Sequence, residues 1–440
     1  MPKYRGIGVG LLGAGVVGSR VAEFLLAERS GEDLNFNHHP LTLRSILIRN
    51  PQKDREFQIP PELVTTDPAA LLENPDIDLI IEVMGGEYPA ADYLNRAITN
   101  SKHVVTANKA LIALHGSEIF EVALKAQMIV AFEATVAGGI PVIKAVREGL
   151  AANRIGWLAG IINGTCNFIL SAMSDAAQEF ETVLSEAQAL GYAEADPSFD
   201  IDGIDAAHKL AIIAAIAFGV PLQFESIYVE GIRDVSRTDV DYAARLGYRI
   251  KHLAMARQTP FGIELRVHPT LVPNSQLLAN VDGVMNAIMI NGDAAGPTLF
   301  YGSGAGAEPT ASAVVADLID VARDFGVDSG NRVPPLAFQS DQLKEIPILS
   351  MDAIETAYYL RLHVLNQAGV MADVTRVLGA GGISIEAILQ QESEPGDPIV
   401  PIIILVHPVL EQAMNQALAE IAGLSQVFEP VVKIRMDSLV

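Results

Sequence analysis

The hexapeptide GAGVVG at residues 13–18 constrains the fold more than any other part of the chain. An apolar run, Ile7–Leu12, precedes it, and an amphipathic stretch follows it. This G-x-G-x-x-G pattern between a strand and a helix is typical of dinucleotide-binding βαβ units, although a glycine-rich turn without a ligand is an alternative. Gly13 permits the tight turn, Gly15 lets a phosphate approach the backbone, and Gly18 lets the helix pack closely on the strand. We therefore expect cofactor contacts at Gly13, Ala14, Gly15, Val16, Val17 and Gly18.

Strands and helices alternate over residues 1–137, which we interpret as a dinucleotide-binding domain. Besides the first strand, the pattern predicts strands at Leu41–Arg49, Asp78–Met84, His103–Thr106 and Met128–Phe132, and a helix at Ala90–Asn100. This alternation predicts a parallel, doubly wound sheet of the Rossmann type. A later helix, residues 309–326, is expected to pack back on this sheet.

The pattern changes after residue 137, and residues 138–308 read as a mixed α+β domain for substrate binding and dimerisation. Long helices are predicted at Phe180–Leu190 and Gly203–Phe218. The predicted strands lie at Ile155–Ile162, Ile227–Gly231, Ile250–Arg257, Ile263–Val267 and Gly283–Asn291. Residues 327–353 contain Pro334-Pro335, Asn331 and Pro347, and we interpret them as a linker.

The tail, residues 355–440, predicts a third domain with the ferredoxin-like order βαββαβ. Leu360, Leu362 and Val364 alternate with polar residues in the first strand. Gly369 precedes a helix, and strands at Ile383–Ser393 and Ile399–His407, a helix at Leu410–Ile421 and a strand at Phe428–Met436 follow. Pro401 indicates that its strand is an edge strand or is bulged.

Composition excludes several classes of protein. The formal charge is −23, so neither nucleic acid nor an anionic membrane is expected as a partner. No apolar run approaches the roughly 18 residues that a membrane helix needs. The single cysteine, Cys166, excludes an internal disulfide and favours a reducing, cytoplasmic location. Because no base is obvious beside it, Cys166 is expected to be a small buried residue rather than a nucleophile.

Positive charge follows the second predicted strand. An NAD-binding protein would place a carboxylate at this strand end, whereas an arginine accommodates the 2′-phosphate of NADP. Here Arg49 ends the strand, and Lys53 and Arg55 follow. These residues favour NADP, with NAD still possible and a solvated basic loop as the alternative.

Residues 191–209 hold five carboxylates and precede Leu210–Phe218, an apolar helical run that must be buried on nearly every side. Asp205 and Lys209 are four residues apart and share one helix face. A lysine beside a carboxylate can transfer a proton to an alkoxide or carbonyl oxygen, and a solvated ion pair is the alternative. Lys109 follows the strand His103–Thr106, where it either reaches a ligand or faces solvent.

Residues 133–139 join the first two domains with one carboxylate and a glycine-rich turn. Glu133 and nearby backbone carbonyls can hold a hard monovalent cation, and a plain hinge is the alternative.

Six stretches together resemble the homoserine dehydrogenases over nearly the whole chain. They are GLLGAGVVGS (10–19), TANKALIA (106–113), EATVAGGIPVIK (133–144), GIINGTCNFIL (160–170), GYAEADPSFDIDGIDAAHKLAI (191–212) and GSGAGAEPTASAVVAD (302–317). The tail resembles the regulatory ACT domain of many members of this family. The chain departs at Cys166, where many relatives have Thr, and at residues 366–369, where ACT domains usually have Asp and Pro before the Gly.

The resemblance implies interconversion of L-homoserine and L-aspartate 4-semialdehyde in threonine, methionine and isoleucine biosynthesis. It implies that Lys209 is the acid–base residue, that Asp205 assists it, and that Glu194 binds the substrate ammonium. Further implied substrate contacts are Lys109, Thr165, Tyr192 and Asp200. Lys109, Gly304 and Gly306 are implied to border the cofactor. The implied ligands of Na⁺ or K⁺ are Glu133, Val136, Gly138 and Ile140. A homodimer or homotetramer inhibited by L-threonine is also implied.

Two other functions are weighed. An aspartate-semialdehyde dehydrogenase needs a thiolate nucleophile, and Cys166 has no nearby histidine in the sequence. A non-catalytic amino-acid sensor would not need Glu194, Asp205 and Lys209.

Overall fold

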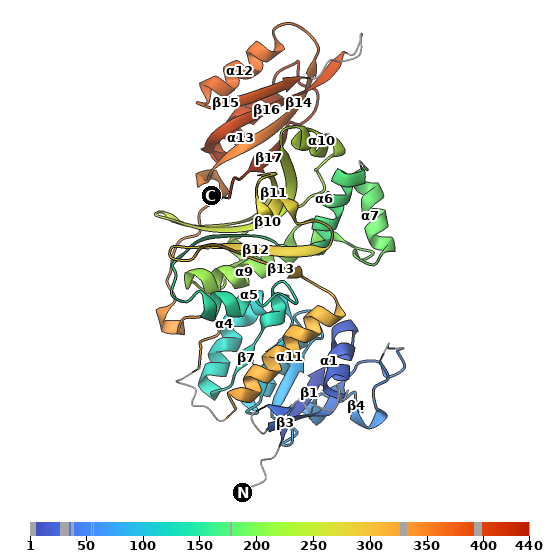
Figure 1. Cartoon of the computed structure of the whole chain (residues 1–440). Coiled ribbons are helices and arrows are strands. Elements are labelled where there is room, and N and C mark those ends of the chain that lie inside the picture. The colour runs from blue at the N-terminus through green and yellow to red at the C-terminus, as the bar shows by residue number, and fades with distance from the viewer. Residues whose placement is uncertain are drawn as a thin grey trace. The chain divides into compact units, whose positions relative to one another are not determined.

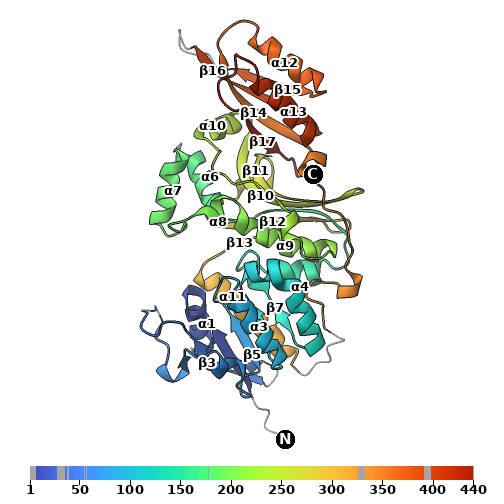
Figure 2. The ribbon, with the colours of Figure 1, turned by 180° about the vertical axis from the view of Figure 1, so that it is seen from behind.

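The computed structural model describes residues 6–26, 35–36, 39–53, 55, 57–176, 178–325, 332–390 and 398–439. Its contacts divide the chain into two compact units (Figures 1 and 2). Unit 1 comprises Met1–Ile155, His208–Glu225 and Asn286–Glu345, and unit 2 comprises Gly156–Ala207, Ser226–Met285 and Ile346–Val440. Each unit therefore draws on three separate segments of the sequence. The predicted domain boundaries stay predictions.

Unit 1 contains the predicted parallel sheet, with the strand order β2-β3-β1-β5-β6-β7 and β4 paired to β3. The strands are β1 (Ile7–Leu12), β2 (Asn35–Phe36), β3 (His39–Leu47), β4 (Val64–Thr65), β5 (Leu79–Glu82), β6 (His103–Thr106) and β7 (Val130–Ala131). Strand β1 pairs in parallel with β3 on one side and β5 on the other. The chain therefore reverses its direction of travel across the sheet at β1, which is where such folds bind nucleotides.

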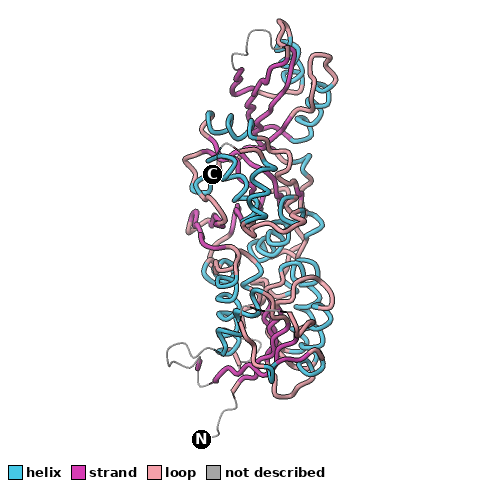
Figure 3. The backbone as a smooth tube through the Cα atoms, turned by 90° about the vertical axis from the view of Figure 1, so that its right-hand side faces the viewer, coloured by secondary structure: helices cyan, strands magenta, loops and turns pink. Residues whose placement is uncertain are grey.

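Helices cover both faces of this sheet (Figure 3). They are α1 (Val16–Leu26), α2 (Ala69–Leu72), α3 (Ala90–Thr99), α4 (Lys109–Ala126), α5 (Val142–Lys144) and α11 (Ala307–Arg323). Although α11 comes late in the sequence, it lies beside α1, and its Val314 and Leu318 share one core with Val9 and Leu11 of β1 (Figure 1). Two further strands of this part of the chain, β12 (Met285–Gly292) and β13 (Gly296–Ser303), pair with each other.

Unit 2 contains a second sheet with the strand order β8-β10-β11-β17-β14-β16-β15, and β9 pairs with β11. The strands before the tail are β8 (Ile155–Ile161), β9 (Tyr228–Val229), β10 (Tyr248–Thr259) and β11 (Gly262–Pro273). The helices before the tail are α6 (Gly164–Ala176), α7 (Phe180–Ala189), α8 (Ser198–Ile201) and α10 (Arg237–Arg245). Helix α9 (Ile204–Phe218) begins in unit 2 and ends in unit 1.

The tail has the predicted order βαββαβ. Its elements are β14 (Glu355–Leu365), α12 (Val370–Ala380), β15 (Ile385–Gln390), β16 (Ile399–Leu410), α13 (Glu411–Ala422) and β17 (Val432–Met436). The predicted strand end at 391–393 lies outside the described residues. The prediction that Pro401 marks an edge strand is wrong, because β16 lies between β14 and β15. Pro401 lies opposite His363 of β14, and on its other side the described pairing with β15 ends at Gln390 opposite Ile402.

The strands of the tail belong to the same sheet as the other strands of unit 2. Strand β17 pairs in parallel with β11, with Arg435 opposite Thr270 and Met436 opposite Leu271. Buried tail residues such as Tyr359 belong to one apolar core with residues of α6 and α7, such as Ile169. Removing the tail would therefore expose part of this core to water, which is costly in proportion to the apolar area.

No helix in the described part of the chain is long and apolar enough to cross a membrane.

Candidate functional site

The glycine-rich turn has the geometry that its sequence predicts. Gly13 has a φ of +98°, and its N–H donates to Leu47 O at 3.0 Å. A Cβ atom at Gly18 would lie 2.1 Å from Gly13 O, so helix α1 could not approach β1 with any larger residue. A Cβ atom at Gly15 would meet nothing within 4 Å. The backbone at Gly15 is therefore open to a ligand, at the amino end of a helix that favours negative charge.

The basic loop after β3 is tied to this turn. Arg55 donates from Nε to Ala14 O at 3.1 Å, and its two terminal nitrogens donate to the carbonyls of Lys53 and Asn50. Its guanidinium thus holds the loop in place through three carbonyl groups. Arg49 and Lys53 are exposed beside it, while Val16 is 73% exposed and Val17 half-buried at the start of α1. The structure brings this predicted cofactor set together around one turn of unit 1.

Glu82, Thr106 and Asn108 form a polar group that sequence reasoning missed. Glu82 ends β5, pairs in register with Leu12 of β1 and Thr106 of β6, and is fully buried. Burial raises the pKa of Glu82, against hydrogen bonds from Thr106 Oγ1 and Met84 N at 2.7 Å each. A polar residue that ends an apolar strand just before Gly85-Gly86 is the signal that could have revealed it.

Asn108 extends this group to the neighbouring helix. It caps α4 by accepting from Leu111 N, and its Nδ2 donates to Gly86 O at 2.6 Å. The cap places Lys109, which is half-buried, in the first turn of α4 at the carboxyl end of β6.

The late glycines serve close packing within unit 1. A Cβ atom at Gly304 would lie 2.0 Å from Asn286 Cγ, and one at Gly138 would lie 2.5 Å from Gly304 O. Gly306, with a φ of +108°, is the residue before α11. Contacts of Gly304 and Gly306 with a cofactor stay predictions.

Three of the predicted site residues in unit 2, Thr165, Asp200 and Asp205, lie around Asn163. Its Nδ2 donates to Asp200 Oδ1 and to Asp205 Oδ2, both at 2.8 Å. Thr165 Oγ1 donates to Tyr192 O at 2.7 Å and contacts Asp200 Oδ2 at 3.3 Å. The first turn of α6, the segment before α8 and the first turn of α9 are thereby joined. We call Asn163, Thr165, Asp200 and Asp205 the substrate cluster.

Other predicted residues lie around this cluster. Tyr192 packs edge-on against Phe168 with ring centroids 5.0 Å apart, and its side chain is 44% exposed. Glu194 is exposed on the segment between α7 and α8, and among the described residues no hydrogen bond joins its carboxylate to the cluster. Lys209 follows Asp205 by one turn of α9 and is 8% exposed, so it is no solvated surface lysine.

Cys166 is buried, and its Sγ donates to Asp200 O at 3.2 Å. It helps to seat α8 on α6.

Glu133 and Asp317 form a second acidic group, in unit 1. Glu133 accepts from the backbone N–H groups of Ile143 and Lys144 at 2.8 and 2.9 Å, and its own N–H donates to Asp317 Oδ2 at 2.8 Å. Burial raises the pKa of Glu133. Burial, and next the neighbouring Glu133 carboxyl, raise the pKa of Asp317 to about 8.

The predicted cation ligands Val136, Gly138 and Ile140 are buried close to Glu133 in the sequence. Carbonyl and carboxylate oxygens are the donors that Na⁺ and K⁺ prefer, and a cation would relieve the cost of burying the Glu133 charge. Ion binding at these residues stays a prediction, and both Glu133 oxygens and the Ile140 carbonyl already accept backbone hydrogen bonds. No group of three or more His, Cys, Asp or Glu side chains that would suit a metal ion occurs among the described residues.

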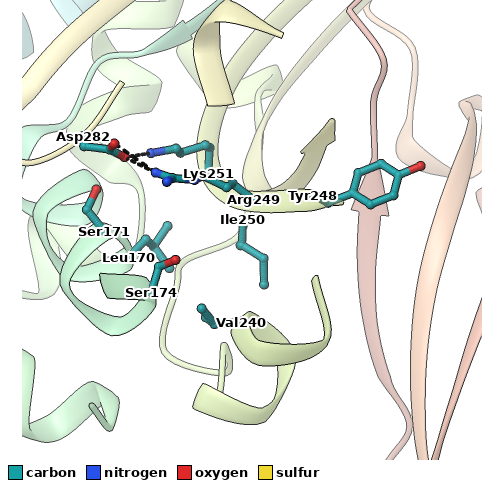
Figure 4. Close-up of a pocket in the computed structure, with 9 residues that line it drawn as sticks. All are labelled: Leu170, Ser171, Ser174, Val240, Tyr248, Arg249, Ile250, Lys251 and Asp282. Carbon is teal, nitrogen blue, oxygen red and sulfur yellow. Dashed lines mark hydrogen bonds and ion pairs between the residues drawn. The ribbon is translucent and has the colours of Figure 1, made fainter. Parts of the chain in front are cut away.

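A small cavity of about 10 Å³ lies between α6, α10 and β10 (Figure 4). Buried Lys251 donates to Asp282 Oδ1 at 2.9 Å and to Val281 O at 2.6 Å, and Arg249 also pairs with Asp282. This volume holds about one water molecule, so the cavity is no substrate pocket. The ion pairs hold the turn at 281–283 against β10.

Two buried arginines connect the tail to the rest of unit 2. Arg361 of β14 donates to both carboxylate oxygens of Asp239 in α10, at 2.7 and 3.1 Å. Arg435 of β17 donates to Glu411 and also to Glu230 Oε2 at 2.6 Å. Burial alone would raise the pKa of Glu411, but the guanidinium of Arg435 and the ammonium of Lys433 hold it at about 2.

A dinucleotide-type turn, in one chain with a helix that carries a buried lysine one turn after an aspartate, places the protein among the nicotinamide-dependent dehydrogenases. Comparison with protein families agrees. The model of the homoserine dehydrogenase family matches residues 141–319, the model of its NAD-binding domain matches 13–133, and an ACT-domain model matches 358–423.

Individual relatives cover the whole chain. A homoserine dehydrogenase of Pseudomonas aeruginosa is 55% identical over 98% of this chain and 99% of its own length. The crystal structure of a homoserine dehydrogenase from Thiobacillus denitrificans has a TM-score of 0.93 at 53% identity and covers 99% of this chain and 100% of its own. A hyperthermophilic archaeal homoserine dehydrogenase solved in complex with NADPH has a TM-score of 0.62 at 27% identity and covers 73% of this chain and 98% of its own. The chain therefore belongs to the homoserine dehydrogenase family, as an oxidoreductase with a nicotinamide-cofactor domain and a C-terminal ACT domain.

Proposed function

We propose that this enzyme interconverts L-homoserine and L-aspartate 4-semialdehyde with NADP, in the biosynthesis of threonine, methionine and isoleucine. The observation that supports it best is the substrate cluster, in which Asp205 is fixed one helical turn before the buried Lys209. The test is NADP-dependent oxidation of L-homoserine at alkaline pH, followed by NADPH absorbance. A chain that oxidised L-aspartate 4-semialdehyde only with phosphate present, and left homoserine untouched, would be the other dehydrogenase.

Each residue of the site has a proposed role. Lys209 exchanges a proton with the substrate's 4-oxygen, and Asp205 assists it. Glu194 pairs with the substrate ammonium, and Thr165, Tyr192, Asp200 and Lys109 hold its remaining polar groups. The bound nicotinamide supplies the hydride chemistry at the substrate carbon.

NADP is the proposed cofactor in preference to NAD. Its support is the exposed Arg49 and Lys53 next to a loop that Arg55 fixes to the phosphate-binding turn. Arg49→Asp should lower kcat/KM for NADP and not for NAD, because only NADP carries the 2′-phosphate. Arg44→Asp, an exposed change on β3 before this loop, is the matched control. Equal kcat/KM for the two cofactors in the wild type would contradict the preference.

We further propose that Na⁺ or K⁺ binds at Glu133, Val136, Gly138 and Ile140. The support is the all-oxygen donor set and the buried carboxylate described above.

The tail is proposed to bind L-threonine and to lower activity. The support is its ACT order and the two arginines that join it to α10 and to Glu230, which give effector binding a direct mechanical connection to unit 2. Because β17 belongs to the sheet of unit 2, point variants test this better than truncation.

Arg361→Lys keeps the charge but loses the two-pronged contact with Asp239. We expect homoserine oxidation without threonine to be retained and inhibition by millimolar threonine to weaken by about 5- to 150-fold, the usual range of allosteric coupling. Arg376→Lys, an exposed tail arginine, is the control. If threonine inhibits neither the wild type nor the variants, the effector is another molecule.

A homodimer or homotetramer in the cytoplasm is proposed as well. Strand β15 ends the sheet of unit 2, and its Ile388 is 44% exposed, so a second copy could cover this edge. Light scattering of the purified protein checks the mass, and a monomer would contradict the proposal.

A further inference from the structure

Asn163 uses every hydrogen-bonding group of its side chain within unit 2. Its Nδ2 donates to Asp200 Oδ1 and Asp205 Oδ2, and its Oδ1 accepts from Cys166 N, all at 2.8 Å. Its side chain is 4% exposed. The backbone N–H of Cys166 can only meet an oxygen, so the amide has one possible orientation, with its NH₂ group toward the two carboxylates.

One amide therefore fixes three elements. It caps α6 at Cys166, it holds the side chain of Asp200 in α8, and it holds that of Asp205 in the first turn of α9. The terminal bond of an aspartate side chain turns easily, and a hydrogen bond to one of its oxygens stops that rotation. Hydrogen bonds to a carboxylate also favour its ionised form over the protonated form.

We propose that Asn163 is a positioning residue for the acid–base step, which it serves by holding Asp205 ionised and oriented one helical turn before Lys209. The proposal rests on the function proposed above, because Asp205 and Lys209 have their roles from it. Asn163 does not exchange the proton itself, since a neutral amide is neither an acid nor a base near neutral pH.

The ionisable groups near Asp205 include an aspartate, a lysine and a histidine. Asp200 shares the amide, Lys209 follows in the same helix, and His252 of β10 interacts with Asp205 electrostatically. Burial lowers the pKa of His252, and its Nε2 lies 2.9 Å from Glu230 O. Burial therefore favours the neutral form of His252, and we expect the acidic limb of the pH profile to come from the aspartates.

Asn163→Ser is the decisive variant. Serine still caps a helix well, so α6 keeps its first turn, but the two N–H donors to the carboxylates are lost. We expect kcat for homoserine oxidation to fall roughly 10- to 100-fold, the value of hydrogen bonds to charged groups. The acidic limb of the kcat/KM profile should move to higher pH by about one unit, because the ionised carboxylates lose their donors. Asn163→Asp keeps volume and cap, adds a third negative charge, and should shift the limb further.

Asn167→Ser is the matched control. Asn167 lies one turn later in α6, is equally buried, and donates from Nδ2 only to backbone carbonyls, those of Val281, Gly283 and Met285. Its loss should lower Tm without moving the pH limb. If Asn163→Ser lowers Tm but keeps the wild-type limb and kcat, Asn163 is merely structural and the inference is wrong. If serine at 163 prevents folding, Asn163→Asp gives the same comparison.

A second measurement keeps the inference separate from the proposed function. The difference in unfolding free energy between wild type and Asn163→Ser should grow as pH rises through the carboxyl range, because only ionised aspartates use the donors. That measurement decides the inference even if the wild type does not oxidise homoserine, a result that would count against the proposed function alone.

Discussion

Two pairs of acidic side chains in this protein differ in the hydrogen-bond donors that their carboxyl groups have. In unit 2, Asp200 and Asp205 share the NH₂ group of Asn163. In unit 1, Glu133 and Asp317 have only backbone N–H donors, and one of these belongs to Glu133 itself. A side-chain amide with two donors serves two ionised carboxylates, whereas the second pair leaves Asp317 with a pKa of about 8.

The difference teaches what each pair can do. The two amide donors favour the ionised form of the Asp200–Asp205 pair, which is the form that the proposed chemistry of Lys209 needs. The Glu133–Asp317 pair is uncharged in part at neutral pH and gains from any cation that comes near.

Lys209→Ala should abolish most of the homoserine oxidation that the Asp200–Asp205 pair is proposed to support. Removal of a positioned acid–base group lowers kcat by about 10²- to 10⁴-fold, while homoserine KM changes little. Lys144→Ala, which removes a lysine paired with Asp320 in unit 1, is the control and should keep kcat. A Lys209→Ala enzyme with a tenth of the wild-type kcat would refute the acid–base assignment.

The second pair should make stability depend on pH. The pKa of Asp317 is raised, so the folded state binds its proton more tightly than the unfolded chain does. The resulting stability is complete below about pH 4 and is lost as pH rises through 8. Asp317→Asn, which imitates the protonated side chain, should therefore become more stable than the wild type as pH rises, by on the order of a few kcal/mol at pH 8.

Urea unfolding at pH 5 and pH 8 measures this difference, in a buffer whose only cation is tetramethylammonium. Asp320→Asn is the control on the same helix. Asp320 forms ion pairs with Lys144 and Arg323, so this substitution should make the protein less stable. An Asp317→Asn difference that is the same at both pH values would show that Asp317 is ionised in the folded protein throughout.

An exposed carboxylate should behave unlike either pair. Glu194→Gln should raise homoserine KM by roughly 10- to 100-fold with a smaller effect on kcat, because a charge-assisted contact with the substrate ammonium is worth about 1.5–3 kcal/mol. Glu186→Gln, which changes an exposed glutamate on α7, is the control. Steady-state kinetics that show an unchanged KM would remove Glu194 from the substrate site.

Local patterns in the sequence predicted much of this fold. Strands β1 and β6 have the predicted bounds, because short apolar runs that end at glycine or polar residues leave little choice of register. Helix α10 was missed because it is mostly polar, and its start depends on a capping box between Ser236 and Asp239. Helix α4 was missed in part because Gly116 interrupts it, and Gly116 is there because a Cβ atom would lie 2.7 Å from Leu222.

The sequence also predicted some of the site residues and missed others. The spacing of Asp205 and Lys209 lies within one helix, so the sequence alone places them on one face. Asn163 was missed because its partners lie 37 and 42 residues away, and no periodicity in the sequence indicates such a contact. Glu82 and Asp317 were missed for the same reason, since their burial depends on strands and helices from distant segments.

The smallest predicted effect concerns the cation. We expect Na⁺ or K⁺ to bind at Glu133 in the folded protein only. Tm should then be a few degrees higher in KCl or NaCl than in tetramethylammonium chloride of equal ionic strength. This shift corresponds to about 1 kcal/mol at a tenfold excess of the ion over its Kd. Glu133→Gln should abolish this difference, because the neutral amide offers the ion no charge. Glu148→Gln, an exposed change in the same region, should keep it. Equal Tm values in all three salts for the wild type would leave Glu133 as the cap of α5 alone, held by Ile143 and Lys144. The burial of its charge would then be offset by these two N–H groups and by the nearby charges of Arg147 and Lys144, and Asp317→Asn should be the more stable protein in every salt.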